Sequence, residues 1–446
     1  MSSLDFLFRP KTVALIGASH DERKLGGVIL KNLLKFKGRL YPVNPKYDSL
    51  MGIKSYPSVD EVPEFIDLSL IMRPAEEIPA LLKSHKGKAR CAVVMSSGFS
   101  ETGRGDIQDE IKKIGIETGV RILGPNCMGV YNPGERLDTL LLPAEKIGRP
   151  KKGNVGVVTQ SGAILHCFFG IMKASNIGIS KAATYGNAVD IDECDLYEYF
   201  SRDRRTDVVI SYIESVGDGR RFLEAAKGLS GEKTLLILKA GKGSSGEAAA
   251  YSHTGRLAGR YEVFTSLLKQ FGIKEVRDFD EMADAVKALS YQRPSKGNRV
   301  LIITNGGGSG VLAADECMRQ GLEAPPLPPE KTARLKETFP PFYAIHNPLD
   351  LTAQVEDGDY LTALSELKDD FDGFVVIALA GVPGITEGLS AMIADFKKKT
   401  DRPIVFHTTC GCGEGKLISA FERSGIPVYP SPERAVRAMK ALLGER

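Results

Sequence analysis

His253 is the residue of this sequence whose surroundings most need a chemical explanation. It lies in the stretch AAAYSHTGRLAGR (248–260), among small residues. An imidazole can act as a nucleophile or as an acid and base near neutral pH. A structural histidine in a core would have bulkier apolar neighbours, whereas small neighbours let a ligand approach the ring closely. The position of His253 therefore raises the question of what the fold brings to it.

Two other segments have the composition of anion-binding turns. In VGVVTQSGAIL (155–165) and VLIITNGGGSGVL (300–312), a β-branched run ends in a threonine and an amide residue, and small residues then open a helix. The first turn of a helix has unpaired N–H groups and a partial positive charge, which a phosphate can reach when the residues are small. The predicted phosphate-binding residues are Gln160, Ser161, Gly162, Gly306, Gly307 and Gly308. An N-cap by Ser161 and close packing by Gly162 would explain the first segment without a ligand.

The N-terminal region resembles a nucleotide-binding domain, with differences that disfavour NAD as its ligand. GASHDERKLGG (17–27) follows the first predicted strand, but Ser19 replaces the second glycine of the dinucleotide pattern. The next strand ends in Asn44 and Lys46 instead of the acidic residue that binds a ribose. Since a lysine suits a phosphate, the sequence predicts a Rossmann-like domain for a phosphorylated ligand other than NAD.

Two later loops of the same region have the composition of ligand-lining loops. SSGFSETG (96–103) and GPNCMGVYNP (124–133) are rich in glycine and polar residues and follow predicted strands. In parallel sheets, ligands bind beyond the carboxyl ends of the strands, so these loops should share one site with residues 17–27.

The elements that position these residues belong to an α/β protein. Short apolar runs alternate with amphipathic stretches along the chain, which predicts parallel sheets covered by helices. At 446 residues the chain is too long for one domain. Linkers rich in polar residues, Pro and Gly at 141–154 and 291–298 indicate domain boundaries.

Composition narrows the class of protein. The sequence has 42% hydrophobic and 26% charged residues and a net charge of +3, which favours neither nucleic acid nor an anionic membrane as partner. No apolar run is long enough to span a bilayer and no signal peptide is recognisable, so we expect a cytoplasmic protein. The seven cysteines form no paired framework, and Cys410 and Cys412 make a poor zinc site, so no metal site is expected.

Taken in order, these motifs resemble one family. GASHDERKLGG, YPVNPK, SSGFSETG, GPNCMGV, TQSGAIL, IESVGDGRRF, SHTGRLAG, TNGGGSG and NPLDLT together resemble the ADP-forming acyl-CoA synthetases, relatives of succinyl-CoA synthetase. The resemblance implies a Rossmann-like CoA-binding domain over 1–135 and two flavodoxin-like ligase domains over 150–291 and 298–446. Within this family, the chain is similar to the alpha subunit of an acetyl-CoA-type enzyme.

The resemblance also implies a reaction and its residues. Acyl-CoA and phosphate give acyl phosphate and CoA; His253 takes the phosphoryl group, and ADP then receives it to give ATP. Glu214, at the end of the strand TDVVISYI, matches the carboxylate partner of the histidine. The residues expected to contact CoA are Gly17, Ala18, Ser19, Lys24, Gly26, Asn44, Lys46, Ser97, Gly98, Phe99, Pro125 and Asn126.

The nucleotide site is expected on another chain. No ATP-grasp domain and no Walker loop is recognisable in this sequence, so ADP or ATP with Mg should bind a separate beta subunit, in an α2β2 assembly. A non-catalytic acyl-CoA-binding regulatory module is the alternative, and the loss of His253 or Glu214 would have favoured it. An NAD-linked oxidoreductase is disfavoured by Ser19 and by the Asn44–Lys46 segment, and an acyltransferase would need a further domain.

Overall fold

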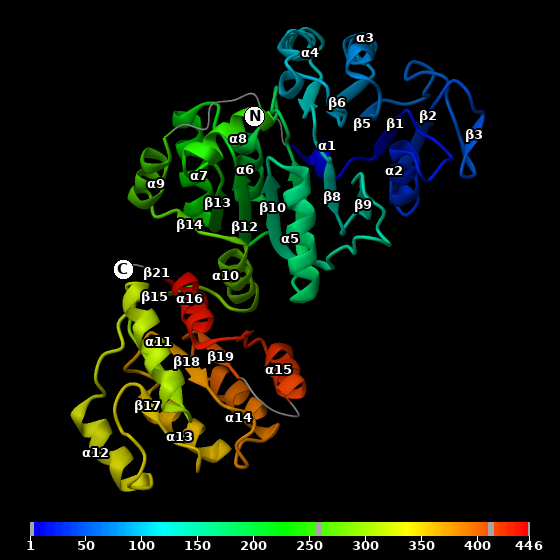
Figure 1. The fold of residues 1–446 in the computed structure, drawn as a ribbon. Helices are drawn as coiled ribbons and strands as arrows, with labels where there is room; N and C mark the ends of the chain where they lie inside the picture. The colour runs from blue at the N-terminus through cyan, green and yellow to red at the C-terminus, as the bar shows by residue number, and fades with distance from the viewer. Residues whose placement is uncertain (1–3, 255–259, 409–413, 445–446) are drawn as a thin grey trace. The chain divides into compact units, whose positions relative to one another are not determined.

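The computed structural model describes residues 4–254, 260–408 and 414–444, the side chains of 250–254 and 414 apart. The chain divides into two compact units, Met1–Arg277 and Asp278–Arg446. This division falls ahead of the linker predicted at 291–298, and the three domain boundaries remain predictions. Each unit is described by itself below (Figure 1).

Over its described residues, the first unit has two large sheets beside a small hairpin, and the first large sheet is parallel throughout. Its strand order is β2-β1-β5-β6-β7. The strands are β1 (Thr12–Ile16), β2 (Arg39–Val43), β5 (Ile66–Ile71), β6 (Ala89–Val94) and β7 (Arg121–Leu123), and β3 (Ser49–Leu50) with β4 (Ile53–Lys54) forms a small separate hairpin. The helical segments are α1 (Asp5–Phe8), α2 (Leu25–Leu33), η1 (Ala75–Glu77), α3 (Ile78–Ser84), η2 (Ser100–Thr102) and α4 (Gly105–Thr118).

The second sheet has the order β14-β13-β12-β10-β11-β8-β9. Its parallel strands are β10 (Lys152–Thr159), β11 (Ile179–Thr184), β12 (Val208–Ile213), β13 (Thr234–Lys239) and β14 (Lys274–Val276). Two short antiparallel strands, β8 (Val130–Asn132) and β9 (Leu137–Asp138), complete one edge. The helices are α5 (Gly162–Ala174), α6 (Glu193–Arg202), α7 (Gly219–Glu232), α8 (Ser244–Thr254) and α9 (Tyr261–Gln270).

The second unit has one parallel five-stranded sheet in the order β17-β16-β18-β19-β20. These strands are β16 (Val300–Thr304), β17 (Leu349–Asp350), β18 (Gly373–Ile377), β19 (Ile404–His407) and β20 (Val428–Tyr429), with β15 (Ser295–Lys296) and β21 (Leu443–Gly444) paired separately. The helices are α10 (Phe279–Tyr291), α11 (Gly307–Arg319), α12 (Pro329–Thr338), α13 (Asp357–Leu367), α14 (Gly388–Lys397), α15 (Glu414–Arg423) and α16 (Pro432–Leu442).

The three large sheets have the same arrangement of their five parallel strands. Numbered along the chain within each sheet, the order is 2-1-3-4-5, the order of flavodoxin-like folds. The strand order reverses between the first and third strands, and ligands bind in the crevice that opens there. The predicted α/β fold is confirmed, and the runs VGVVT, TDVVISYI and VLIIT form the strands β10, β12 and β16. The antiparallel β8–β9 edge differs from the expectation of purely parallel sheets.

Buried apolar side chains hold these layers together. The strands β1, β16 and β18 are buried along their whole length, as expected for strands covered on both faces. Among the residues described, no helix combines the length and the apolar composition that crossing a bilayer requires.

Candidate active site

The predicted phosphate turn after β10 lies at the switch point of the second sheet. The Thr159 hydroxyl donates to the Ser161 carbonyl at 3.0 Å, which fixes the bend between strand and helix. Ser161 occupies the N-cap position of α5, yet its side chain makes no capping bond. The N-cap explanation for Ser161 is therefore wrong, and the first-turn amides of α5 have no capping side chain from it.

Close packing against a neighbouring loop requires a glycine at position 162. A Cβ built on Gly162 would lie 2.1 Å from Cγ of Met128, so any larger residue would displace that side chain. The close-packing explanation is thus correct for Gly162, and it brings the loop after β7 against the first turn of α5.

Gln160 connects the ends of two adjacent strands. Its Oε1 accepts from the backbone N–H of Glu214 at 2.9 Å and of Ser215 at 3.1 Å, and its Nε2 donates to the Ser215 hydroxyl at 3.2 Å. Gln160 is only 3% exposed, and its backbone N–H donates to the Tyr212 carbonyl. The structure therefore joins two residues that the sequence analysis selected independently, Gln160 and Glu214.

Glu214 is itself buried, with 5% of its surface exposed. The Tyr212 side chain lies beside the Glu214 carboxylate. Burial, with this carboxylate beside the ring, raises the pKa of the Tyr212 phenol, so the phenol stays protonated and can donate. A carboxylate in such a setting can orient an imidazole through its N–H group.

A cavity of about 530 Å³ opens beside this turn within the first unit. Five predicted ligand residues line it: Ser97, Asn126, Gln160, Ser161 and Gly162. Its apolar lining comes from Leu25, Met72, Met95, Met128 and Leu141. The loops of the first sheet therefore share one cavity with the phosphate turn of the second.

Other predicted CoA contacts surround the carboxyl edge of the first sheet without lining this cavity. Gly17 has a φ of +87°, and a Cβ there would lie 2.6 Å from the Met72 carbonyl oxygen. Asn44 donates from Nδ2 to the Ala18 carbonyl at 2.8 Å, which ties the loops after β1 and β2 together. The remaining residues of this group are the buried Ser19 and Gly26 and the exposed Lys24 and Lys46.

The turn at Gly98 and Phe99 is organised by Glu101, which the sequence analysis did not select. Glu101 Oε1 accepts from the N–H groups of Gly98 at 2.7 Å and Phe99 at 3.2 Å, and Oε2 accepts from Nδ2 of Asn187 at 2.6 Å. Burial alone would raise the pKa of Glu101, but these hydrogen bonds outweigh it and hold the pKa below its ordinary value. The Phe99 side chain is fully buried, so only its backbone is placed to meet a ligand.

The segment after β11 attaches the second sheet to the first. Asn187 and Val189 donate backbone hydrogen bonds to Pro125 and Gly124, and Asn187 is only 1% exposed. Pro125 follows a cis peptide bond. The sequence motif YGNAVD carries the same signal as the other turns, a strand followed by glycine and an amide residue, and Asn187 lines the cavity.

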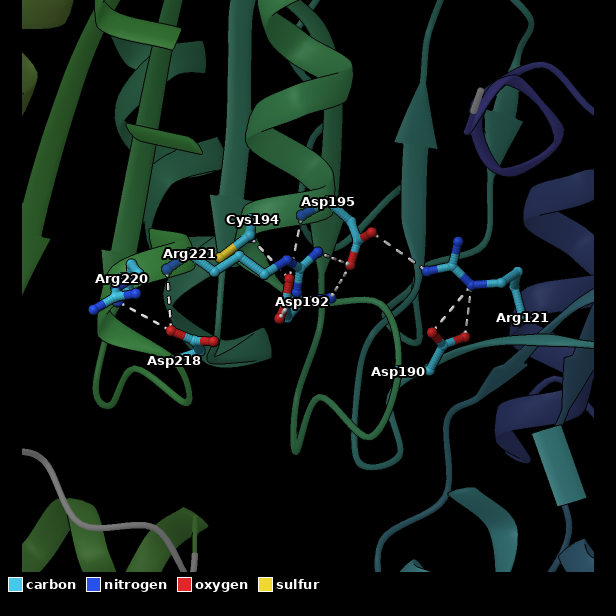
Figure 2. Close-up of polar contacts among 8 residues, drawn as sticks. All are labelled: Arg121, Asp190, Asp192, Cys194, Asp195, Asp218, Arg220 and Arg221. Atoms are coloured by element: carbon cyan, nitrogen blue, oxygen red, sulfur yellow. Dashed lines mark hydrogen bonds and ion pairs between the residues drawn. The ribbon is translucent and has the colours of Figure 1, made fainter. Parts of the chain in front are cut away.

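An ion-pair network supports this segment (Figure 2). Arg121, at the start of β7, pairs with Asp190 and with Asp195, and Arg221 of α7 pairs with Asp195 and with Asp192. Figure 2 shows the two arginines on either side of Asp195. Burial and the neighbouring Asp195 raise the pKa of Asp192, against the opposing effect of Arg221. The network links the first sheet to α6 and α7.

The turn after β16 in the second unit repeats the design of the turn after β10. The Thr304 hydroxyl donates to the Gly306 carbonyl at 3.0 Å, as Thr159 does for Ser161. Asn305 Oδ1 accepts from the N–H of Leu379, just past β18, at 2.9 Å. Gly306 is the N-cap of α11, and Gly307 and Gly308 open that helix. The internal repeat seen in the sequence is therefore a repeat of structure.

Two predictions fall partly or wholly outside the described residues. His253 lies in α8, whose backbone is described, but its side chain is outside the description. Cys410 and Cys412 lie outside it entirely. Over the described part of the chain, no group of His, Cys, Asp and Glu side chains could hold a metal ion.

Three family models match successive segments of the chain. A CoA binding domain matches residues 11–133, a succinyl-CoA ligase like flavodoxin domain matches 152–289, and a ligase-CoA domain matches 300–370. Residues 11–133 hold the loops that line the cavity from the first sheet, and 152–289 hold Gln160, Glu214 and His253.

Comparison with individual proteins extends this likeness over the full length. The chain is 36% identical to the acetate–CoA ligase [ADP-forming] II subunit alpha of Pyrococcus furiosus, over 99% of this chain and 97% of that one. It is also 36% identical to the acetate–CoA ligase [ADP-forming] of Methanocaldococcus jannaschii, of which it spans 63%. Among solved structures, it superposes on the acetyl-coenzyme A synthetase 1 of Ca. Korarchaeum cryptofilum, solved with phosphate and ADP. That match has a TM-score of 0.92 and 34% identity, over 99% of this chain and 96% of that one. The chain therefore belongs to the family of the ADP-forming acetate–CoA ligases.

Proposed function

We propose that this chain is the alpha subunit of an ADP-forming acyl-CoA synthetase acting on acetyl-CoA or a similar acyl-CoA. A phosphate oxygen attacks the thioester carbonyl, the C–S bond breaks, and CoA leaves as acyl phosphate forms. A nitrogen of His253 then attacks phosphorus, and the P–O bond to the acyl group breaks to release the carboxylate. The phosphohistidine finally gives its phosphoryl group to ADP.

The hydrogen bonds that Gln160 Oε1 accepts from the backbone N–H groups of Glu214 and Ser215, beside the cavity, are the observation that carries this proposal. They set a buried carboxylate at the end of β12 next to the turn at the end of β10. A histidine that attacks phosphorus needs a carboxylate on its other nitrogen, to fix the tautomer and to offset the developing positive charge. We assign this role to Glu214 and the nucleophile to His253. The helix that carries His253, α8, lies beside η2, which supports a position near the cavity.

Phosphate is proposed to bind at the first turn of α5, through Ser161 and Gly162 with Gln160 beneath them. Phosphoryl transfer depends mainly on positioning and on stabilisation of charge, both of which helix N-termini supply. Gly306, Gly307 and Gly308, at the start of α11, are proposed to form a second phosphate-binding turn. The repeated Thr–amide turn supports this assignment.

CoA is proposed to bind along the carboxyl edge of the first sheet. Its phosphate groups would meet the loop of Gly17, Ala18, Ser19, Lys24 and Gly26, together with Asn44 and Lys46. Ser97, Gly98, Phe99, Pro125 and Asn126 would lead the thioester end into the cavity. The lining of that cavity by Ser97 and Asn126 supports this direction.

The nucleotide is proposed to bind a separate ATP-grasp beta subunit, with Mg, in an α2β2 assembly in the cytoplasm. The P. furiosus relative is named as an alpha subunit, and the M. jannaschii relative, whose name gives no subunit, extends well beyond the part this chain matches. Both support a division of the activity between two chains.

Labelling of His253 tests the proposal. The chain incubated with acetyl-CoA and ³²P-labelled phosphate should acquire a label that is acid-labile and alkali-stable, as a phosphoramidate is. His253→Ala should lose this label but still exchange labelled phosphate into acetyl phosphate in the presence of CoA, because that step precedes histidine attack. A non-catalytic regulatory module would bind acetyl-CoA and show neither reaction, which would refute the proposal.

A further inference from the structure

Lys239, the last residue of β13, is a buried lysine beside the backbone of Glu214. Only 2% of its surface is exposed. Its Nζ donates to the Glu214 carbonyl at 2.7 Å and to the Ala240 carbonyl, and the Phe264 ring centroid lies 5.7 Å from Nζ. A buried ammonium group is costly unless it is hydrogen-bonded, so these carbonyls hold the side chain in one place.

The two peptide groups that flank Glu214 are thereby held from opposite sides. The order of neighbouring strands is β13-β12-β10, with Glu214 following the central strand. From β10, Gln160 accepts the Glu214 N–H at 2.9 Å; from β13, Lys239 donates to the Glu214 carbonyl at 2.7 Å. Rotation of the backbone at Glu214 would break one of these bonds, so Gln160 and Lys239 together fix the direction of the carboxylate.

We propose that Lys239 is a positioning residue for the phosphohistidine step, acting through Glu214. The inference rests on the proposed function, in which Glu214 orients His253. It assigns Lys239 no part in the preceding step, the attack of phosphate on acyl-CoA.

The charges around Lys239 give this role a pH dependence. Burial lowers the pKa of Lys239 to about 8. Glu214, Glu247 and Glu275 favour the charged form of the lysine, whereas Lys242 disfavours it. Lys239 is therefore protonated at neutral pH and loses its charge as the pH rises through about 8. A neutral amine is a weaker donor to the Glu214 carbonyl than an ammonium, so phosphorylation of His253 should slow over this range.

Two lysine variants of the whole chain test the proposal. Lys239→Met removes the donor. Lys233→Met is the matched control, because Lys233 lies just before the other end of the same strand and also donates to a backbone carbonyl, that of Asp203. Each protein is incubated with acetyl-CoA and ³²P-labelled phosphate at pH 7 to 9.5, and the rate of acid-labile labelling is measured. The exchange of labelled phosphate into acetyl phosphate is measured in parallel.

Lys239→Met should label about 100-fold more slowly, the effect of a small misplacement of a catalytic group, with phosphate exchange within about twofold of wild type. Its labelling rate should not fall further above pH 8, whereas the wild-type rate should. Lys233→Met should match wild type in both assays. Lys239→Gln keeps a donor and should fold even if Lys239→Met does not; it should label at an intermediate rate and lack the fall above pH 8.

Three results would count against the inference. If either Lys239 variant were labelled at the wild-type rate and with the wild-type pH profile, this inference would be wrong while the proposed function would stand. Equal losses of labelling and of phosphate exchange would also overturn the inference, because they would mean that Lys239 stabilises the fold and does not act on the histidine step. Absence of label on the wild-type chain would instead overturn the proposed function, and this inference with it.

Discussion

Nε of Arg121 lies 3.0 Å from Oδ1 and 2.8 Å from Oδ2 of Asp190, and this pair joins two sheets of the first unit (Figure 2). Arg121 begins β7 of the first sheet, and Asp190 follows β11 of the second. Asp190 also accepts the Ile122 N–H at 2.7 Å. The cavity that both sheets line therefore depends on an ion pair outside its own lining.

We expect Asp190→Ala to lower the free energy of unfolding by about 1–3 kcal/mol, because it leaves the Ile122 N–H without its acceptor and Arg121 with Asp195 as its remaining partner. Asp190→Asn, which can still accept from the Ile122 N–H, should lose less. Urea titration followed by circular dichroism measures the change. Glu61→Ala, at an exposed position, is the control and should stay within about 0.5 kcal/mol of wild type. A cost for Asp190→Ala no larger than for the control would contradict the role of this pair.

CoA affinity is expected to depend on Lys46. Lys46 is exposed, just past β2, where nicotinamide-binding domains have an acidic residue. Lys46→Glu should weaken CoA binding by about five- to tenfold in calorimetry on the whole chain, because it turns an attraction for phosphate into a repulsion. The whole chain is needed, because β8 at 130–132 pairs with β11 and a fragment ending at 135 would separate them. NAD binding tighter than CoA would contradict the assignment of this domain.

The sequence predicted the strands and the turns that follow them because both signals are local. In VLIIT followed by NGGG, for example, the β-branched run predicts a strand and the glycines predict a turn, all within a few residues. The partners of each turn were not predictable, because they depend on which strands become neighbours. Nothing near Gln160 in the sequence indicates that its amide binds the backbone at Glu214, fifty-four residues away. From the sequence, Lys239 is an ordinary polar residue at the end of a strand. It is a buried hydrogen-bond donor because β13 packs against β12.

Glu214→Gln is expected to fold as the wild type does and to slow the labelling of His253 by about 10²–10⁴-fold, the cost of one positioned catalytic partner. The amide keeps the size of the side chain, and the backbone bonds to Gln160 and Lys239 do not involve the carboxylate. Rapid-quench measurement of acid-labile label checks the rate. Exchange of phosphate into acetyl phosphate should persist and serves as the control. Labelling at the wild-type rate would remove Glu214 from the mechanism.

Lys239 also makes a prediction about stability at alkaline pH. Its pKa is about 8 in the folded protein, below the ordinary value of 10.5, so between these values the unfolded chain binds a proton that the folded chain does not. The free energy of unfolding should therefore rise between about pH 8 and pH 10.5, by roughly 3 kcal/mol at most. As the pH falls toward 8, the cost of burying the protonated Lys239 returns. The difference in unfolding free energy between wild type and Lys239→Met, from urea titrations at pH 7, 9 and 10.5, isolates this contribution. A difference that does not change with pH would contradict the lowered pKa.

Gly162→Ala should weaken the binding of phosphate. The new Cβ would lie 2.1 Å from Cγ of Met128, so Met128 must move, and the space available to it is the cavity that both residues line. We expect the KM for phosphate in the exchange reaction to rise about tenfold, with a stability cost of about 1–3 kcal/mol from overpacking. Gly170→Ala is the matched control, because it is the same change in the same helix at a position where a Cβ meets nothing within 4 Å. It should leave the KM unchanged and raise stability by up to about 1 kcal/mol. Adding Met128→Ala to Gly162→Ala restores the space and should recover most of the phosphate affinity. If the double variant stays as impaired as Gly162→Ala alone, the displaced methionine is not the cause, and the first turn of α5 does not bind phosphate in the way proposed.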